Sequence, residues 1–198
     1  EYPDFYGTID VKSGEVTDST RVWRDWTNAA KNGEWQNQYE MAYNPADQTI
    51  YVLGQGVDDE NLLTSVLYSV QEDGSFEEIM KLDYVYFNVT FDYDGTMWGV
   101  RAKEGKDGTP SGTLLVKFNQ DFEPEASMEL LKEKSPLIQG TYGAMAFDYS
   151  TGDLYWYAVT YPNAYAYLFR VPTEMKKSCE LEYMGGVATG TMLNGMYI

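Results

Sequence analysis

Short runs of apolar residues alternate with polar turns along the whole chain, in the manner of β-strands. Residues 40–43 and 50–53 are two such runs, separated by a turn of Pro, Asp and Gln, which is a hairpin signal. Residues 62–70 and 76–82 form a second pair around the turn dipeptide Asp73-Gly74. The pattern therefore predicts four strands in a unit of about 50 residues.

One motif recurs along the chain: an apolar, a small and an aromatic residue, then Asp or Asn, a short turn, and an apolar-aromatic pair. Its aromatic anchors, Tyr43, Phe91 and Phe147, lie 48 and 56 residues apart. The copies span residues 41–51, 89–98 and 145–155, and a fourth, cut-off copy begins at residue 195. A fixed period of this kind indicates a repeat fold.

A second motif, an apolar strand that ends in a polar turn, alternates with the first. Its anchors are Ile9, Val70, Phe118 and Val171. Repeated four-stranded units of about 50 residues are typical of β-propeller blades. A β-sandwich is the alternative, but a sandwich need not repeat one motif at one spacing. The sequence therefore predicts an all-β fold, a β-propeller of four-stranded antiparallel blades with about four repeats.

The repeats also predict the domain organisation. We expect a single propeller domain over residues 1–198, with repeat units at residues 39–84, 85–132 and 139–185. The chain enters in the outer half of a blade and leaves on an innermost strand, so residues 1–22 and 187–198 are expected to contribute to a further blade. Two arrangements stay open: three complete blades plus one assembled from both termini, or a fragment of a larger propeller.

The segment 148–156, D-Y-S-T-G-D-L-Y-W, has echoes at Asn44 and Asp92. It resembles the blades of secreted bacterial β-propeller-repeat proteins in the broad YncE-like and quinoprotein-like group. The resemblance implies a propeller fold and an extracellular, cell-surface or periplasmic location, and it implies no particular activity.

The amino-acid composition excludes several classes of function. The chain has 31 acidic and 14 basic residues and no histidine, which gives a formal net charge of −17. It has no basic stripe for nucleic acid, and imidazole catalysis and His-based zinc sites are excluded. No apolar run is long enough to predict a membrane-spanning helix. The single cysteine, Cys179, can form no internal disulfide and is interpreted as a packed thiol.

In an up-and-down blade, the loop between strands two and three opens on the same face as the link to the next blade. The longest predicted connections belong to these two classes, and we expect a ligand on this long-loop face because extended loops carry function. They are residues 21–38, 54–61, 103–111, 133–142 and 161–164.

Aromatic residues in these connections are the candidate ligand-binding residues. Trp23, Trp26 and Trp35 lie in the first connection. They would either stack on a ligand, such as a sugar ring or a peptide, or fill the space where blades of the propeller meet. The usual burial of tryptophan favours the second of these roles. Tyr161 and Tyr165 alternate with small residues and would either wall a groove or pack between blades.

Two acidic clusters, residues 58–60 and 92–95, contain carboxylates as calcium loops do, but neither has the twelve-residue loop that ends in Glu. We therefore predict no metal and no cofactor. No nucleophile elbow, phosphate-binding loop or dinucleotide fingerprint occurs.

The expected function is a non-catalytic binding or scaffolding propeller that engages a glycan or a protein through the long-loop face. One alternative is a carbohydrate-active hydrolase or lyase with paired carboxylates in the central channel. Another is a purely structural domain of a larger surface protein.

Overall fold

The computed structural model of the chain describes residues 4–10, 12–22, 40–57, 59–60, 62–73, 75–160 and 165–187. In this part of the chain the regular secondary structure is entirely β, so it contains no helix that could cross a membrane. The strands are β1 (Asp4–Ile9), β2 (Val16–Val22), β3 (Glu40–Asn44), β4 (Thr49–Val57), β5 (Leu63–Val70), β6 (Phe76–Lys81), β7 (Tyr86–Phe91), β8 (Met97–Glu104), β9 (Pro110–Phe118), β10 (Pro124–Lys132), β11 (Ser135–Pro136), β12 (Gln139–Asp148), β13 (Asp153–Thr160), β14 (Tyr165–Val171), β15 (Ser178–Glu180) and β16 (Glu182–Val187).

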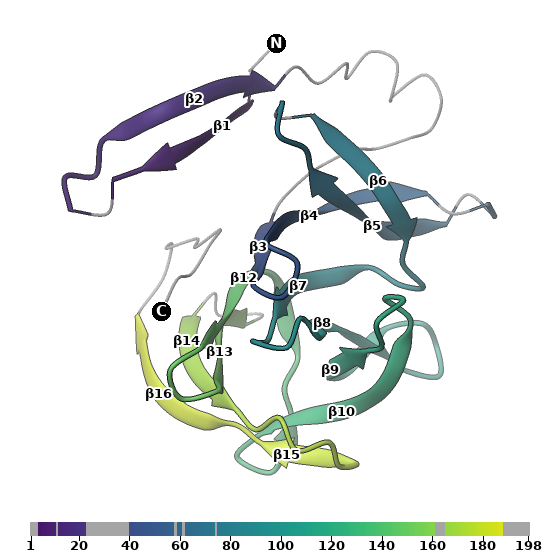
Figure 1. Ribbon diagram of the computed structural model, residues 1–198. Helices are drawn as coiled ribbons and strands as arrows, with labels where there is room; N and C mark the ends of the chain where they lie inside the picture. The colour runs from purple at the N-terminus through teal and green to yellow at the C-terminus, as the bar shows by residue number, and fades with distance from the viewer. Residues whose placement is uncertain are drawn as a thin grey trace.

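Three sheets, antiparallel except for one short parallel strand in the second, form the body of the molecule (Figure 1). The first consists of β3-β4-β5-β6, the second of β7-β8-β9-β10 extended by β11, and the third of β12-β13-β14-β16. We call them the first, second and third blade. Strand β7 contacts both β3 and β12, so the leading strands of the three blades lie next to one another around a common axis.

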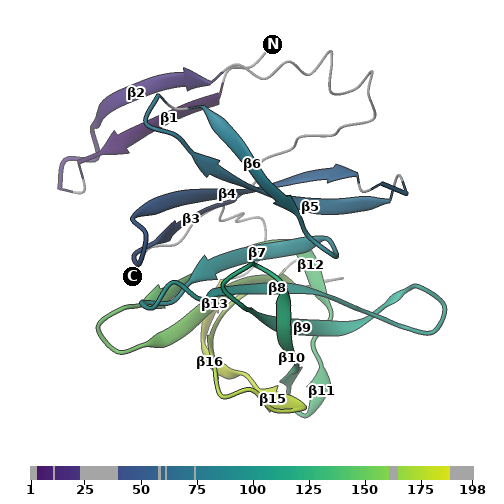
Figure 2. The same cartoon turned by 45° about the vertical axis from the view of Figure 1, so that its right-hand side comes forward.

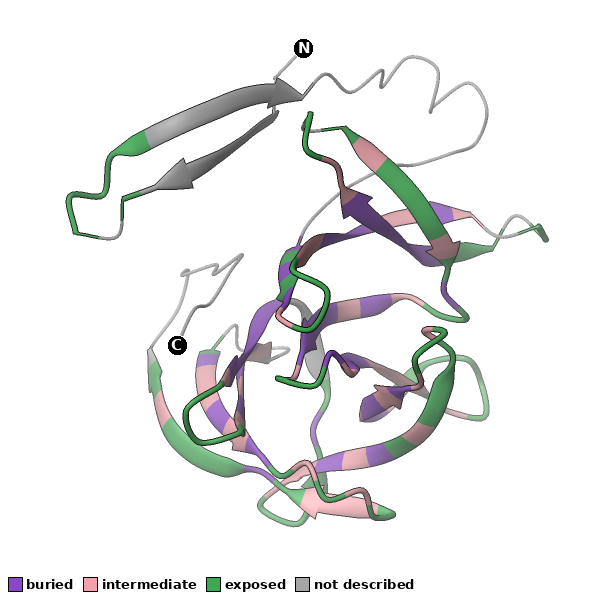
Figure 3. Cartoon of the chain, in the orientation of Figure 1, coloured by how far each residue is buried: buried purple, intermediate pink, exposed green. Residues whose placement is uncertain are grey.

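Buried side chains fill the space between neighbouring blades. Leu53 and Leu67 of the first blade pack with Tyr86, Phe91 and Phe118 of the second, and all five are fully buried. A larger core joins the second blade to the third; its members include Trp98, Leu115, Met128, Trp156 and Phe169. The outer strand β6 is mostly exposed, as Figure 3 shows. Hydrophobic burial between sheet faces therefore holds the blades together.

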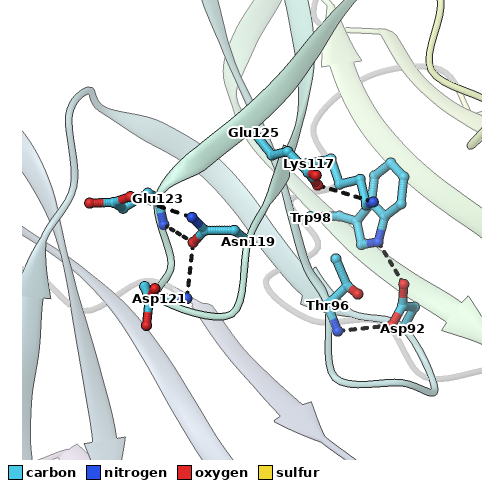
Figure 4. A network of polar contacts seen from close by, with 8 residues as sticks. All are labelled: Asp92, Thr96, Trp98, Lys117, Asn119, Asp121, Glu123 and Glu125. Carbon is cyan, nitrogen blue, oxygen red and sulfur yellow. Dashed lines mark hydrogen bonds and ion pairs between the residues drawn. The ribbon is translucent and has the colours of Figure 1, made fainter.

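The repeated Asp of the first motif organises the turn that follows each leading strand. Asp92 Oδ1 accepts the N–H of Asp94 at 3.1 Å. The same oxygen accepts the N–H of Thr96 at 2.9 Å, and Oδ2 accepts the Trp98 indole N–H at 3.0 Å (Figure 4). Asp148 Oδ1 likewise accepts the N–H of Ser150 at 2.9 Å. Side-chain oxygens that satisfy turn N–H groups explain why Asp or Asn recurs at this position.

Gly95 in the β7–β8 turn is expected to be required for two reasons: its backbone has a positive φ, and there is no room for a Cβ. Gly95 has φ of 82°, and a Cβ there would lie 2.7 Å from the Ala46 Cβ in the first blade. Gly108 has φ of 77° with nothing within 4 Å of an added Cβ, so it is a matched control. We expect Gly108→Ala to cost about 1 kcal/mol through φ alone and Gly95→Ala about 1–3 kcal/mol more through the clash. Urea unfolding measures both, and equal losses would contradict the clash.

One strand crosses between two blades. After β14, the chain leaves the third blade and β15 pairs in parallel with β10 of the second, Leu130 opposite Cys179. Leu181 follows and is buried in the core between the two blades, and β16 then returns to pair with β14. The Cys179 thiol is half-buried, and burial raises its pKa to about 11, so it is protonated at neutral pH. Its structure is that of the packed thiol predicted from the sequence.

Two connections that the sequence presents as long loops are partly strand: residues 54–57 belong to β4, and residues 103–104 and 110–111 belong to β8 and β9. Gly54 pairs with Val66 and Gly56 with Thr64, so β4 and β5 continue almost to their connection. Likewise, Lys103 pairs with Gly112 at the ends of β8 and β9. The glycines are not loop markers here, because a Cβ at Gly56 would lie 2.7 Å from Val66 Cγ2; the glycine permits close packing within the sheet.

The N-terminal strands β1 and β2 form a hairpin, which within the described residues pairs with no other strand. In both Figure 1 and Figure 2 the hairpin lies on the side of the first blade away from the second. Residues 188–198 lie outside the described residues, so a further blade built from both termini stays a prediction.

Candidate functional site

A buried polar cluster lies where the three leading strands meet. Glu40, at the start of β3, is 6% exposed; its Oε2 accepts the N–H of Val89 at 2.6 Å and its Oε1 accepts the Asn88 side-chain amide at 3.2 Å. The same Asn88 amide donates to the Gly143 carbonyl at 2.8 Å, and its oxygen accepts the Trp156 indole N–H at 3.2 Å. The cluster therefore links all three blades by hydrogen bonds.

The carboxyl of Glu40 has a perturbed pKa. Burial raises this pKa well above the ordinary value of 4.5, and hydrogen bonds from the N–H groups of Val89 and Met145 and from the Asn88 amide oppose the rise. Leading strands of different blades are not hydrogen-bonded to each other as a sheet, so their backbone N–H groups need other acceptors. Glu40 supplies an acceptor to both β7 and β12.

Glu40, Asn88 and Ala144 occupy equivalent positions in the three blades. Each stands three residues before a repeat anchor, Tyr43, Phe91 or Phe147. The repeat alignment alone contains this signal, but sequence reasoning did not use it and missed the cluster. At this level of the common axis the equivalent positions supply one carboxylate, one amide and one methyl group.

The leading strands β3, β7 and β12 contain only two carboxylates, Glu40 and Asp148, at opposite ends of the axis. Asp148 is the last residue of β12. Its carboxylate accepts hydrogen bonds from the hydroxyl and the N–H of Ser150 in the following turn, and these bonds lower the pKa of Asp148. Cleavage of a glycosidic bond by paired carboxylates needs two of them about 5–10 Å apart across the bond. Within the described leading strands, no second carboxylate stands beside Glu40.

The acidic clusters of the sequence give no metal site in the described part of the chain. There, no three Asp, Glu or Cys residues gather as metal ligands would. The Asp92 carboxylate is occupied by turn N–H groups and the Trp98 indole. Asp58 lies outside the described residues.

Of the predicted ligand-binding residues, Trp23, Trp26, Trp35 and Tyr161 lie outside the described residues. Tyr165 begins β14 at the end of the third blade where the β13–β14 loop lies, and it is 40% exposed. Its ring centroid lies 6.3 Å from that of Tyr167 on the same face of the strand.

Tyr165 is the first ring of an aromatic ladder on the third blade. Tyr167 lies 5.8 Å from Phe169 and 5.9 Å from Tyr183 of the outer strand β16. The second blade contributes Lys132, whose Nζ lies 4.7 Å from the centre of the Tyr167 ring. Phe169 is fully buried, whereas Tyr183 is 57% exposed. We call Tyr165, Tyr167 and Tyr183 the tyrosine shelf.

A hollow of about 520 Å³ lies at the opposite, tight-turn end of the first blade. It mixes amide and hydroxyl side chains with aliphatic ones, and it is lined by Gln48, Thr49, Ile50, Tyr51, Ser69, Val70, Gln71, Glu72 and Ile79.

Comparison with known proteins identifies the architecture of the fold. No family model and no curated protein sequence matches the chain. Its structure is similar to that of CoXyl43, a GH43 β-xylosidase/α-arabinofuranosidase from a compost microbial metagenome crystallised with xylotriose, with a TM-score of 0.62 at 12% identity. The match covers 92% of this chain and 66% of that one. The fold is that of a β-propeller.

Two further propeller enzymes are similar. RS223 β-xylosidase has a TM-score of 0.59 at 14% identity, over 90% of this chain and 64% of that one. A GH43_1 enzyme from Xanthomonas citri has a TM-score of 0.57 at 11% identity, over 88% and 63%. This chain thus spans slightly under two thirds of the length of these enzymes, and the likeness shows the fold alone. The predicted all-β propeller of four-stranded antiparallel blades is confirmed.

Proposed function

We propose that this protein is a non-catalytic propeller that binds a neutral glycan at the loop end of its blades. The observation that carries the proposal is the occupancy of the three equivalent positions of the leading strands by Glu40, Asn88 and Ala144. The one carboxylate among them accepts hydrogen bonds from the other two leading strands. It therefore serves inter-blade cohesion, and the paired arrangement that glycoside cleavage uses is not formed there.

The fold and the net charge of the chain both support a neutral glycan as the ligand. One similar propeller, CoXyl43, was crystallised with xylotriose, which is a neutral oligosaccharide. A net charge of −17 disfavours anionic ligands such as phosphates and uronic acids. Tyr165, exposed at the loop end of the third blade, presents an aromatic ring of the kind that stacks on sugars.

The test separates binding from cleavage in one sample. We expect calorimetric titration with xylotriose to give saturable binding, while chromatography of the same mixture after prolonged incubation shows intact xylotriose. A 4-nitrophenyl β-xyloside assay provides a second readout of hydrolysis. Absence of binding to xylotriose and to a panel of neutral oligosaccharides would overturn the proposal, and so would release of xylose.

A second candidate is the carbohydrate-active hydrolase, which the structural likeness to xylosidases favours. A buried carboxyl with a raised pKa, such as Glu40, is also the state that a general acid needs at neutral pH. If the wild type cleaves the xyloside and Glu40→Gln abolishes cleavage while xylotriose still binds, the hydrolase replaces the binding propeller.

A further inference from the structure

We propose that the tyrosine shelf of the third blade is the surface on which a neutral oligosaccharide stacks. This inference rests on the proposed glycan-binding function and assigns a place to it, away from the buried polar cluster around Glu40. The shelf begins at the loop end with Tyr165 on β14 and extends to Tyr183 on the outer strand β16.

The exposure of the ladder is graded in a way that core packing does not require. Its apolar member, Phe169, has no exposed surface and packs 6.2 Å from Trp156. Its hydroxyl-bearing neighbours Tyr165 and Tyr183 are 40% and 57% exposed. An aromatic ring with a polar edge at the surface offers a flat apolar face for sugar C–H groups and a hydroxyl for hydrogen bonds.

The shelf is held in place before any ligand arrives. Tyr167 lies between Tyr165 at 6.3 Å and Tyr183 at 5.9 Å, and Tyr183 also contacts Phe169 at 6.4 Å. Gly186 lies beneath the rings: a Cβ there would lie 3.0 Å from the Ala166 carbonyl oxygen, 3.1 Å from Tyr167 Cδ1 and 3.2 Å from the Tyr183 hydroxyl. Rings already fixed by their neighbours lose little side-chain entropy on binding.

The charges around the shelf select a neutral ligand. The Lys132 ammonium lies over the Tyr167 ring and pairs with Glu133 at 3.5 Å, so the charges of these two side chains offset each other beside the shelf. On the neighbouring strands Arg170 pairs with Glu182 through its Nε at 2.8 Å. The chain as a whole repels polyanions. An uncharged polyol with apolar ring faces fits these conditions.

The experiment compares exposed tyrosines in two parts of the molecule. Tyr165→Ala and Tyr183→Ala are each expected to raise the Kd for xylotriose about tenfold, which corresponds to one stacking contact. Tyr93→Ala is the matched control, since Tyr93 is 71% exposed in the β7–β8 turn of the second blade, and its Kd should equal that of the wild type.

A second variant tests the shelf without removing a ring. Gly186→Val is expected to push against the Ala166 carbonyl of β14 as well as against Tyr167 and Tyr183, and to weaken xylotriose binding more than tenfold. Thermal melting gives the Tm of every variant. A variant with a lowered Tm is compared with the wild type at a temperature at which both are fully folded.

The outcomes distinguish the two proposals. If the wild type binds no neutral oligosaccharide, the proposed function and the shelf both fail. If the wild type binds xylotriose and Tyr165→Ala, Tyr183→Ala and Gly186→Val bind it equally well, the shelf alone is wrong. Hexalysine and polygalacturonate serve as charged probes, and binding of either at the shelf in place of xylotriose also overturns the inference.

Discussion

Replacing Trp156 by alanine is expected to lower the free energy of unfolding by about 3–5 kcal/mol, the usual range for loss of a fully buried tryptophan. Trp156 has no exposed surface, packs against Phe169 with ring centroids 6.2 Å apart, and belongs to the core between the second and third blades. Its indole N–H also donates to Asn88 of the second blade. The substitution therefore removes apolar contact and leaves a buried amide oxygen without its donor.

Urea unfolding followed by circular dichroism measures this loss. Tyr183→Ala is a suitable control, because Tyr183 lies on the same blade but is 57% exposed, and its substitution should cost about 1 kcal/mol or less. A loss below about 1 kcal/mol for Trp156→Ala would contradict the role of the inter-blade core.

Replacing Glu40 by leucine is expected to cost about 2–5 kcal/mol, although leucine has a similar volume. The N–H groups of Val89 and Met145 and the Asn88 amide would lose a buried acceptor, and each unsatisfied buried donor costs about 1–3 kcal/mol. Chemical unfolding at pH 5 gives the loss. Unchanged stability would mean that these donors find other acceptors.

The pH dependence of stability follows from the same carboxyl. Because its pKa in the folded protein lies well above the ordinary 4.5, the folded state holds a proton that the unfolded state releases between these two values. The contribution of Glu40 to stability is therefore fully present below pH about 4.5 and falls as the pH rises through that window.

Glu40→Gln is expected to remove this fall while keeping an oxygen for the Val89 N–H. Unfolding midpoints between pH 4.5 and 8 should decline less steeply for Glu40→Gln than for the wild type. Glu125→Gln changes an exposed carboxylate that pairs with Lys117 at 3.1 Å, and should keep the wild-type slope. Parallel slopes for wild type and Glu40→Gln would contradict the raised pKa.

The sequence predicted those parts of the fold that depend on local chemistry. The first motif becomes the hairpins β3–β4, β7–β8 and β12–β13, with Asp92 and Asp148 in the turns as expected. Alternation of apolar residues and turn-forming side chains fixes such hairpins within a dozen residues. Strand pairing inside a blade could therefore be predicted without any information about distant contacts.

Features that depend on contacts between blades were not predicted. Glu40 and Asn88 are 48 residues apart, and their hydrogen bond exists only because two blades face each other. Gly54 and Gly56 of β4 were interpreted as loop, since their pairing with β5, and the close approach of Gly56 to Val66, are invisible in a local pattern. The exposure of Tyr183 was likewise missed, because it depends on the outer position of β16 in its sheet.

The crossing of β15 has a consequence for how the protein comes apart. This strand is hydrogen-bonded to the second blade, while the chain on either side of it belongs to the third. Separating these blades therefore requires breaking backbone pairing as well as an apolar contact, which couples their opening into one cooperative unit. We therefore expect mechanical or thermal stress on either blade to be shared by both, so that the second and third blades unfold together.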